Sequence, residues 1–237
     1  MCPTSDLWSR LLEPGRLILL SGDRAELRAF HQELAHYVLH EKEGHVLWCD
    51  GDHGFNPYDF AELNLQRGFP AEWGAQRLLV KRCMTPFQWD TVLTKHIAEK
   101  LYATPSSLVL AAPFDGLYST DELTDWERED YIRFCLKHLK ALALRHKVPV
   151  VISVDMARWC KAHPLIAWEA FNACDARFAL RPAGDGWTAL QVHTGLDLAT
   201  DAVRQLTLFD FAPIASFKAQ ARPLISLRSV PVQEAEA

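Results

Sequence analysis

Ser107-Leu108-Val109-Leu110-Ala111-Ala112 is a continuous apolar run, and the turn Pro113-Phe114-Asp115-Gly116 follows it directly. Beyond the turn, apolar residues recur at spacings of three and four between Ile132 and Ala143, which predicts an amphipathic helix. A second short run, residues 148–153, is rich in β-branched residues. A strand, a helix and a strand in this order predict a right-handed βαβ unit, with both strands in the covered centre of a parallel sheet.

The rest of the chain repeats this alternation on both sides of the central unit. Apolar runs at 17–20, 45–49 and 78–81 predict three further strands, and a helix is expected over 86–102. Two more runs flank a Gly-rich turn and predict a β-hairpin, at 176–180 and 187–193. We therefore predict an α/β fold, a three-layer α/β/α core with a mostly parallel central sheet and a C-terminal β-hairpin. The core is expected over 1–200 and a tail over 201–237.

Composition limits the classes of function. The chain has 237 residues, of which 49% are hydrophobic and 23% charged, so one globular domain is expected. The formal net charge of −5 argues against a protein that coats DNA, and any contact with DNA is expected to be indirect. The six cysteines form no C-x-x-C pair, so we predict reduced thiols and no metal site. No apolar run is long enough to span a membrane, which leads us to expect a soluble intracellular protein.

The turn after the first predicted strand lies where a phosphate-binding loop would lie. Such a loop needs two glycines, a lysine and a hydroxyl residue in the pattern G-x-x-x-x-G-K-[ST]. Gly22 is present, but Leu27, Arg28 and Ala29 occupy the other three positions. The favoured interpretation is a βα turn that binds no nucleotide, and the alternative is weak nucleotide binding through Arg28.

Two aspartates follow the second predicted strand at the carboxyl edge of the sheet, where ligands bind in such folds. Asp50 and Asp52 are either a catalytic or Mg²⁺-binding pair, or caps of the helix that begins near Pro57. Capping is the favoured interpretation.

The order of several short motifs resembles the ATPase core of the RecA/RadA recombinase superfamily, and its archaeal and eukaryotic branch most closely. The resemblance covers roughly residues 10–195. It rests on Asp50 with Phe55 and Pro57 in the turn after the second strand, on Arg82 before the next helix, and on three segments of the central unit. These segments are 117–121, 133–143 and 148–152. The resemblance implies a RecA-like fold and a nucleotide site at the carboxyl edge.

The sequence departs from that family where the chemistry of ATP hydrolysis is carried out. The phosphate-binding (Walker A) loop is degenerate, and the aspartate of the Walker B motif falls on Ala112. The catalytic glutamate of the family falls on Asp52. Phosphoryl transfer depends on such positioned charges, so their replacement implies a pseudo-ATPase, with no catalytic residue and no cofactor.

A short motif lies outside the core, at Gln205-Leu206-Thr207-Leu208-Phe209-Asp210-Phe211. It resembles peptides that bind sliding clamps, in which Gln205 would enter a polar pocket while Leu206, Leu208, Phe209 and Phe211 fill an apolar one. Phe209 with Ala212 also fits the Phe-x-x-Ala peptide that links neighbouring recombinase protomers. The alternative is a final strand or helical turn that buries these apolar side chains in the chain's own core.

We therefore expect a non-catalytic RecA/RadA-like adaptor in DNA repair or damage tolerance. Its partner would be a sliding clamp, a recombinase or a repair polymerase, bound through residues 205–212. Such a protein would be cytoplasmic and associated with the nucleoid, or nuclear in a eukaryote. The alternatives are a divergent ATPase that uses Arg28, Asp50 and Asp52, and a direct DNA-binding module.

Overall fold

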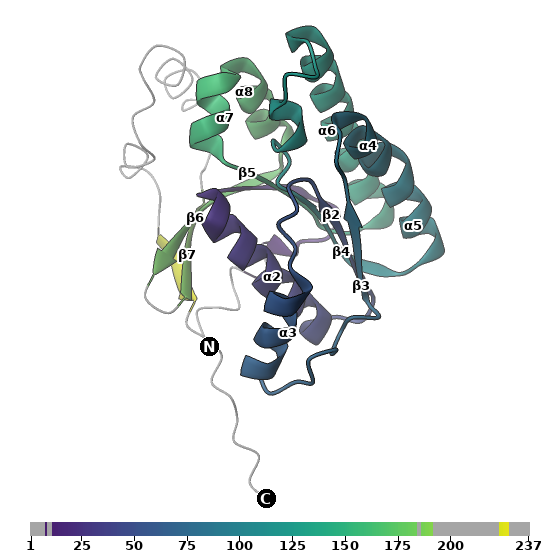
Figure 1. The fold of residues 1–237 in the computed structure, drawn as a ribbon, viewed down its shortest axis with the longest axis vertical. Coiled ribbons are helices and arrows are strands. Elements are labelled where there is room, and N and C mark those ends of the chain that lie inside the picture. The colour runs from purple at the N-terminus through teal and green to yellow at the C-terminus, as the bar shows by residue number, and fades with distance from the viewer. Residues whose placement is uncertain (1–7, 9–10, 184–185, 192–222, 228–237) are drawn as a thin grey trace, which may run out of the picture.

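The computed structural model describes residue 8 and residues 11–183, 186–191 and 223–227, which form one sheet between two layers of helices (Figure 1). The predicted three-layer α/β architecture is confirmed. The eight strands of the described residues are β1 (Leu17–Ser21), β2 (His45–Asp50), β3 (Leu78–Arg82), β4 (Ser106–Ala112), β5 (Val150–Val154), β6 (Ala176–Ala183), β7 (Gly186–Gln191) and β8 (Pro223–Leu227).

The strands lie in the order β3-β2-β4-β5-β1-β6-β7-β8. Strands β1 to β6 are all parallel, so their carboxyl ends meet at one edge of the sheet. The predicted β-hairpin is confirmed, because β7 pairs antiparallel with β6. β8 comes from the segment that the sequence analysis assigns to the tail, and it pairs antiparallel with β7.

Helices connect the parallel strands, and most of them begin at a side-chain cap. Asp23, Asn56, Thr85 and Thr124 each accept a backbone N–H in the first turn of the helix that follows. None of the helices within the described ranges is long and apolar enough to cross a membrane. The helical elements are α2 (Arg24–Glu41), α3 (Pro57–Gln66), α4 (Pro86–Thr91), the π-helical η1 (Val92–His96), α5 (Ile97–Ala103), the 3₁₀ turn η2 (Leu117–Ser119), α6 (Asp125–His146), α7 (Met156–Ala162) and α8 (Pro164–Ala173).

Alternate residues of each central strand face opposite layers, and both layers are apolar. Ile18 and Leu110 pack under α2 and α3, whereas Leu19 and Val109 pack under α4 to α8. The predicted apolar face of α6 is confirmed from Ile132 to Ala143, and it lies on the second of these layers. Because both faces of the sheet are covered, polar chemistry is left to its edges.

Candidate functional site

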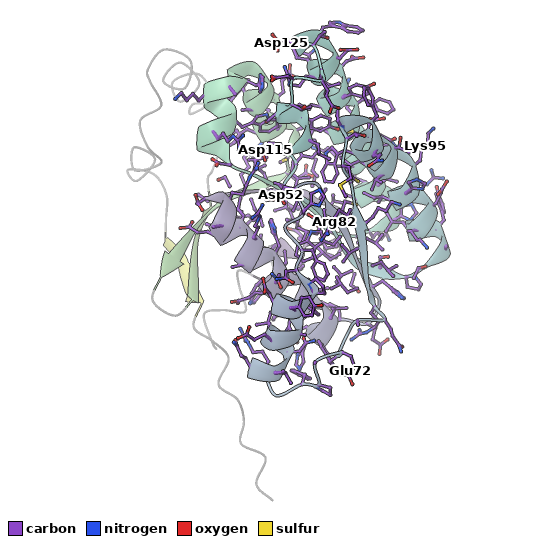
Figure 2. All side chains as sticks on the ribbon, viewed as in Figure 1. Asp52, Glu72, Arg82, Lys95, Asp115 and Asp125 are labelled. Carbon is purple, nitrogen blue, oxygen red and sulfur yellow. The ribbon has the colours of Figure 1, made fainter. Side chains whose placement is uncertain are left out.

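The carboxyl edge of the sheet brings together charged residues that are far apart in the sequence. Arg24 and Arg28 come from the start of α2, Asp52 follows β2, Arg82 ends β3 and Asp115 follows β4. Figure 2 shows Asp52, Asp115 and Arg82 near this edge, next to the start of α2. This edge is where parallel α/β sheets bind their ligands, so we take it as the candidate site.

Arg28 forms a direct ion pair with Asp52. Its Nη2 and Nε atoms lie 2.7 Å and 3.2 Å from Asp52 Oδ2, so both donors converge on one carboxylate oxygen. The Arg28 side chain is 45% exposed, whereas that of Asp52 is only 9% exposed. Arg28, the candidate cation for a nucleotide, is therefore paired with Asp52, the candidate catalytic carboxylate.

Arg24 lies one helical turn before Arg28 on the same side of α2 and extends the pair into a cluster. Its Nε lies 3.8 Å from Asp52 Oδ2, and its Nη2 lies 3.5 Å from Asp115 Oδ2. Two arginines of one helix thus neutralise two aspartates that follow β2 and β4. Within the described residues, no group of three or more His, Cys, Asp or Glu side chains could hold a metal ion.

Asp115 is a buried carboxylate of this cluster, with its side chain only 1% exposed. Burial raises the pKa of its carboxyl group to about 6, although the nearby guanidinium of Arg24 acts in the opposite direction. Asp155, which follows β5, raises this pKa further by like-charge repulsion. Within the described part of the chain, neither carboxylate oxygen of Asp115 receives a well-formed hydrogen bond, and the buried hydroxyl of Ser153 also has no partner. Such under-satisfied polar groups are uncommon in a folded interior.

Asp50 shapes the loop after β2 instead of facing a ligand. Its buried carboxylate accepts the amides of Gly54 at 2.8 Å and Phe55 at 3.3 Å, and it pairs with Arg82 Nε at 3.2 Å. Arg82 also donates to the carbonyl of Phe55 at 2.8 Å. These contacts engage both carboxylate oxygens of Asp50, so its role in the described structure is to fix the loop.

The expectation that Asp50 or Asp52 caps the helix near Pro57 is wrong. The cap of α3 is Asn56, whose side chain accepts the amide of Tyr58 at 3.0 Å. Asp50 is held by the loop amides before the helix begins, and Asp52 faces the arginines of α2. Asn56 is the better cap because it directly precedes Pro57, the first residue of the helix.

Gly22 lies in a turn too short to be a phosphate-binding loop of the expected register. Only Gly22 and Asp23 separate β1 from α2, so Leu27, Arg28 and Ala29 lie inside the helix. The Asp23 carboxylate accepts the amide of Ala25 at 2.8 Å and places a negative charge at the helix start. A side chain at position 22 would contact Leu27 and Leu180, so apolar groups fill the adjacent space. The geometry is that of a short βα turn.

Sequence reasoning placed Gly22, Arg28, Asp50 and Asp52 at the same edge, but it missed Arg24 and Asp115. Two signals point to these residues. Arg24 precedes Arg28 by four residues on a helix, so the two share a side. Asp115 follows the buried strand β4 by three residues, at the edge where the parallel strands end.

The clamp-binding-like peptide remains a prediction. Residues Gln205, Leu206, Leu208, Phe209, Phe211 and Ala212 lie outside the described residues. No protein-family model matches the chain, and a search of curated proteins returns no significant match. The function must therefore be argued from the residues themselves.

Proposed function

We propose that this chain is a non-catalytic, RecA/RadA-like adaptor in DNA repair or damage tolerance. The observation that carries the proposal is the ion pair between Arg28 and Asp52. In the resemblance to RecA/RadA proteins, these two residues stand where the family has its phosphate-binding lysine and its catalytic glutamate. Here the two charges face each other, so a nucleotide would have to displace Asp52 from Arg28.

The β1–α2 turn supports the same proposal. A bound phosphate needs several backbone amides that converge on it, and the helix start supplies some of them only when they are free. In this chain the turn has two residues, and the carboxylate of Asp23 already accepts an amide of the first helical turn. A phosphate brought to this helix start would meet a like charge.

The adaptor would act through residues 205–212, in the cytoplasm next to the nucleoid or in the nucleus of a eukaryote. Gln205, Leu208 and an aromatic residue are the few side chains that would supply most of the binding free energy to a sliding clamp. Phe209 and Ala212 would instead serve a recombinase, and a repair polymerase is the third partner in this class.

Binding of the purified full-length chain to its host's sliding clamp tests this proposal. We expect a Kd of about 1 μM or tighter, weakened at least about tenfold by the double change Gln205→Ala and Phe209→Ala. Asp210→Ala is the matched control, because Asp210 is not among the residues assigned to the pockets of the clamp. If the clamp does not bind, the host recombinase is tested with Phe209→Ala. An absence of binding to both proteins, or equal binding by all variants, would overturn the adaptor proposal.

One observation favours the alternative of a divergent ATPase. A carboxyl group with a pKa of about 6, beside an arginine at the carboxyl edge of a parallel sheet, is typical of catalytic carboxylates. This alternative predicts ATP turnover that Asp115→Asn abolishes while clamp binding is unchanged. Direct DNA binding has less support, because Arg24, Arg28 and Arg82 are each paired with an aspartate.

A further inference from the structure

The start of α6 and the turn before it form a strongly acidic part of the surface. Of the ten residues 121–130, six are Asp or Glu and one, Arg128, is basic. The Arg128 side chain is buried and donates to the backbone carbonyls of Tyr118, Thr120 and Leu123, so it adds little positive charge to the exterior. The acidic side chains therefore dominate the exterior here.

Capping accounts for some of these acids but not for all of them. Glu127 closes a capping box with Thr124, and Asp125 pairs with Arg128 in the first turn of the helix. Acids near a helix start are also favoured by the helix dipole. Asp121 and Asp130 lie outside that first turn and are exposed. The one basic side chain close to Asp130 on this helix, Arg133, is shared with Glu129 and Glu169.

Large aromatic side chains are exposed among these acids. Trp126 is 73% exposed, Phe134 is 57% exposed, and Asp130 lies midway between them in the sequence. Because the three residues are four apart, they form one line along the outer side of α6. Trp126 makes no ring contact with any aromatic side chain of the described residues.

The aromatic side chains continue from α6 onto α4. The rings of Tyr131 and Phe87 are 6.2 Å apart and nearly perpendicular, and Phe87 is itself 51% exposed. We use the name α6 surface for Phe87, Trp126, Asp130, Tyr131 and Phe134. A group of exposed aromatic residues within a charged rim is typical of protein interaction sites.

We propose that the α6 surface docks a basic amphipathic segment of a partner protein, with Lys or Arg on one side and apolar residues at helical spacing on the other. Charge complementarity selects this occupant, because the acidic side chains repel nucleic acid and anionic membranes. They also disfavour a second copy of this chain, whose symmetric interface would bring like charges together. The proposal goes beyond the adaptor function and is independent of residues 205–212.

Trp126 is expected to supply the largest part of the binding free energy. Tryptophan combines a large apolar area with few rotatable bonds, and it is enriched among the residues that dominate interfaces. Asp130 would contribute through its charge, by pairing with a basic side chain of the partner and by speeding the encounter. Loss of either residue should weaken binding, but only loss of the charge should change its salt dependence strongly.

The probe for this proposal is a fluorescent Leu/Lys peptide of about five helical turns, with its leucines on one side. A second peptide has the same composition in an order that abolishes the apolar side. Fluorescence anisotropy with the full chain at about 0.15 M salt gives the two affinities. We expect the first peptide to bind with a micromolar Kd, and the second to bind at least about tenfold more weakly.

Variants then locate the binding site. Trp126→Ala and Asp130→Lys should each weaken binding by roughly tenfold. The matched control for Trp126→Ala is Tyr58→Ala, which removes another highly exposed aromatic residue, on α3. Glu72→Lys is the control for charge, since Glu72 lies at the opposite end of the molecule from Asp125, which begins α6 (Figure 2). Both controls should bind within about twofold of the unmodified chain.

Four results would overturn the proposal, and the first three concern the peptides and the controls. They are an absence of binding by the amphipathic peptide, equal binding of the reordered peptide, and equal effects of test and control variants. A loss confined to Asp130→Lys would also overturn it, because attraction by charge alone does not need the aromatic side chains. Since Trp126 and Asp130 are exposed, both variants are expected to fold, and a thermal unfolding curve of each checks this.

Discussion

The guanidinium of Arg28 lies 2.7 Å from the carboxylate of Asp52, and this ion pair joins the second turn of α2 to the loop after β2. Arg24 extends the contact to Asp115, so one helix is tied to the ends of two strands. In a nucleotide-binding protein such charges face the ligand. Here they face each other, and this pairing is the basis of the proposed non-catalytic function.

The coupling between Arg28 and Asp52 is expected to be small. Arg28 is nearly half exposed, so solvent screens its charge, and such pairs contribute about 1 kcal/mol or less. A double-mutant cycle with Arg28→Ala and Asp52→Ala, followed by urea unfolding, measures this coupling. Arg28→Ala combined with Glu72→Ala should be additive. A coupling of several kcal/mol in the first cycle would contradict the exposed geometry.

Asp50 should matter far more for stability than Asp52. Asp50→Ala leaves the amides of Gly54 and Phe55 and the guanidinium of Arg82 without their buried acceptor. Because the Arg82 side chain is 41% exposed, the main cost is that of the two unsatisfied amides, about 1–3 kcal/mol. Urea unfolding of Asp50→Ala and Asp52→Ala makes the comparison. Equal losses of stability in the two variants would refute the role assigned to Asp50.

The fold could be predicted in large part because its signals are local. The apolar run of β4 and the periodicity of α6 each identify an element without knowledge of its neighbours. The edge of the sheet at which Arg28 and Asp52 lie also follows from the strand–helix order. Their pairing does not, because the sequence cannot show that the β1–α2 turn has only two residues and places Arg28 inside a helix.

The contact between Arg24 and Asp115 could not be predicted from the sequence for the same reason. Each has an ordinary local setting, one at a helix start and one in a turn, and only the packing of α2 across the edge brings them within 3.5 Å. Asn56 shows the opposite case. It directly precedes a proline-led helix, and this local signal identifies the cap better than the carboxylates of Asp50 and Asp52 do.

Asp115→Asn should stabilise the protein at neutral pH. The pKa of the Asp115 carboxyl group is about 6 in the folded state, whereas its ordinary value, which applies to the unfolded chain, is 3.8. The folded state therefore binds this proton more tightly. The contribution of Asp115 to stability is therefore full below about pH 4 and is lost as the pH rises through about 6. The asparagine variant should gain on the order of 2 kcal/mol at about pH 7.5 and little at about pH 4. Chemical unfolding at the two pH values measures this, and a pH-independent difference would contradict it.

His31 should have the opposite pH dependence. Burial lowers the pKa of its imidazole from 6.5 to about 3, so the unfolded state binds this proton more tightly. The contribution to stability is present above about pH 6.5 and is lost as the pH falls toward 3. His31→Leu should therefore lose less stability than the unmodified chain between about pH 7 and pH 4, by a few kcal/mol. Unfolding free energies across that range test it, and parallel curves for the two proteins would disprove it.

The arginines of α2 pair with Asp52 and Asp115 at the edge of the sheet where a nucleotide would bind, and we propose that this pairing prevents nucleotide binding. Calorimetric titration of Mg²⁺–ATP into the purified full-length chain tests it most directly. We predict no binding by the unmodified chain at concentrations up to about 1 mM. A Kd of about 100 μM or tighter in the unmodified chain, lost in Asp52→Asn, would contradict the claim and favour the divergent ATPase.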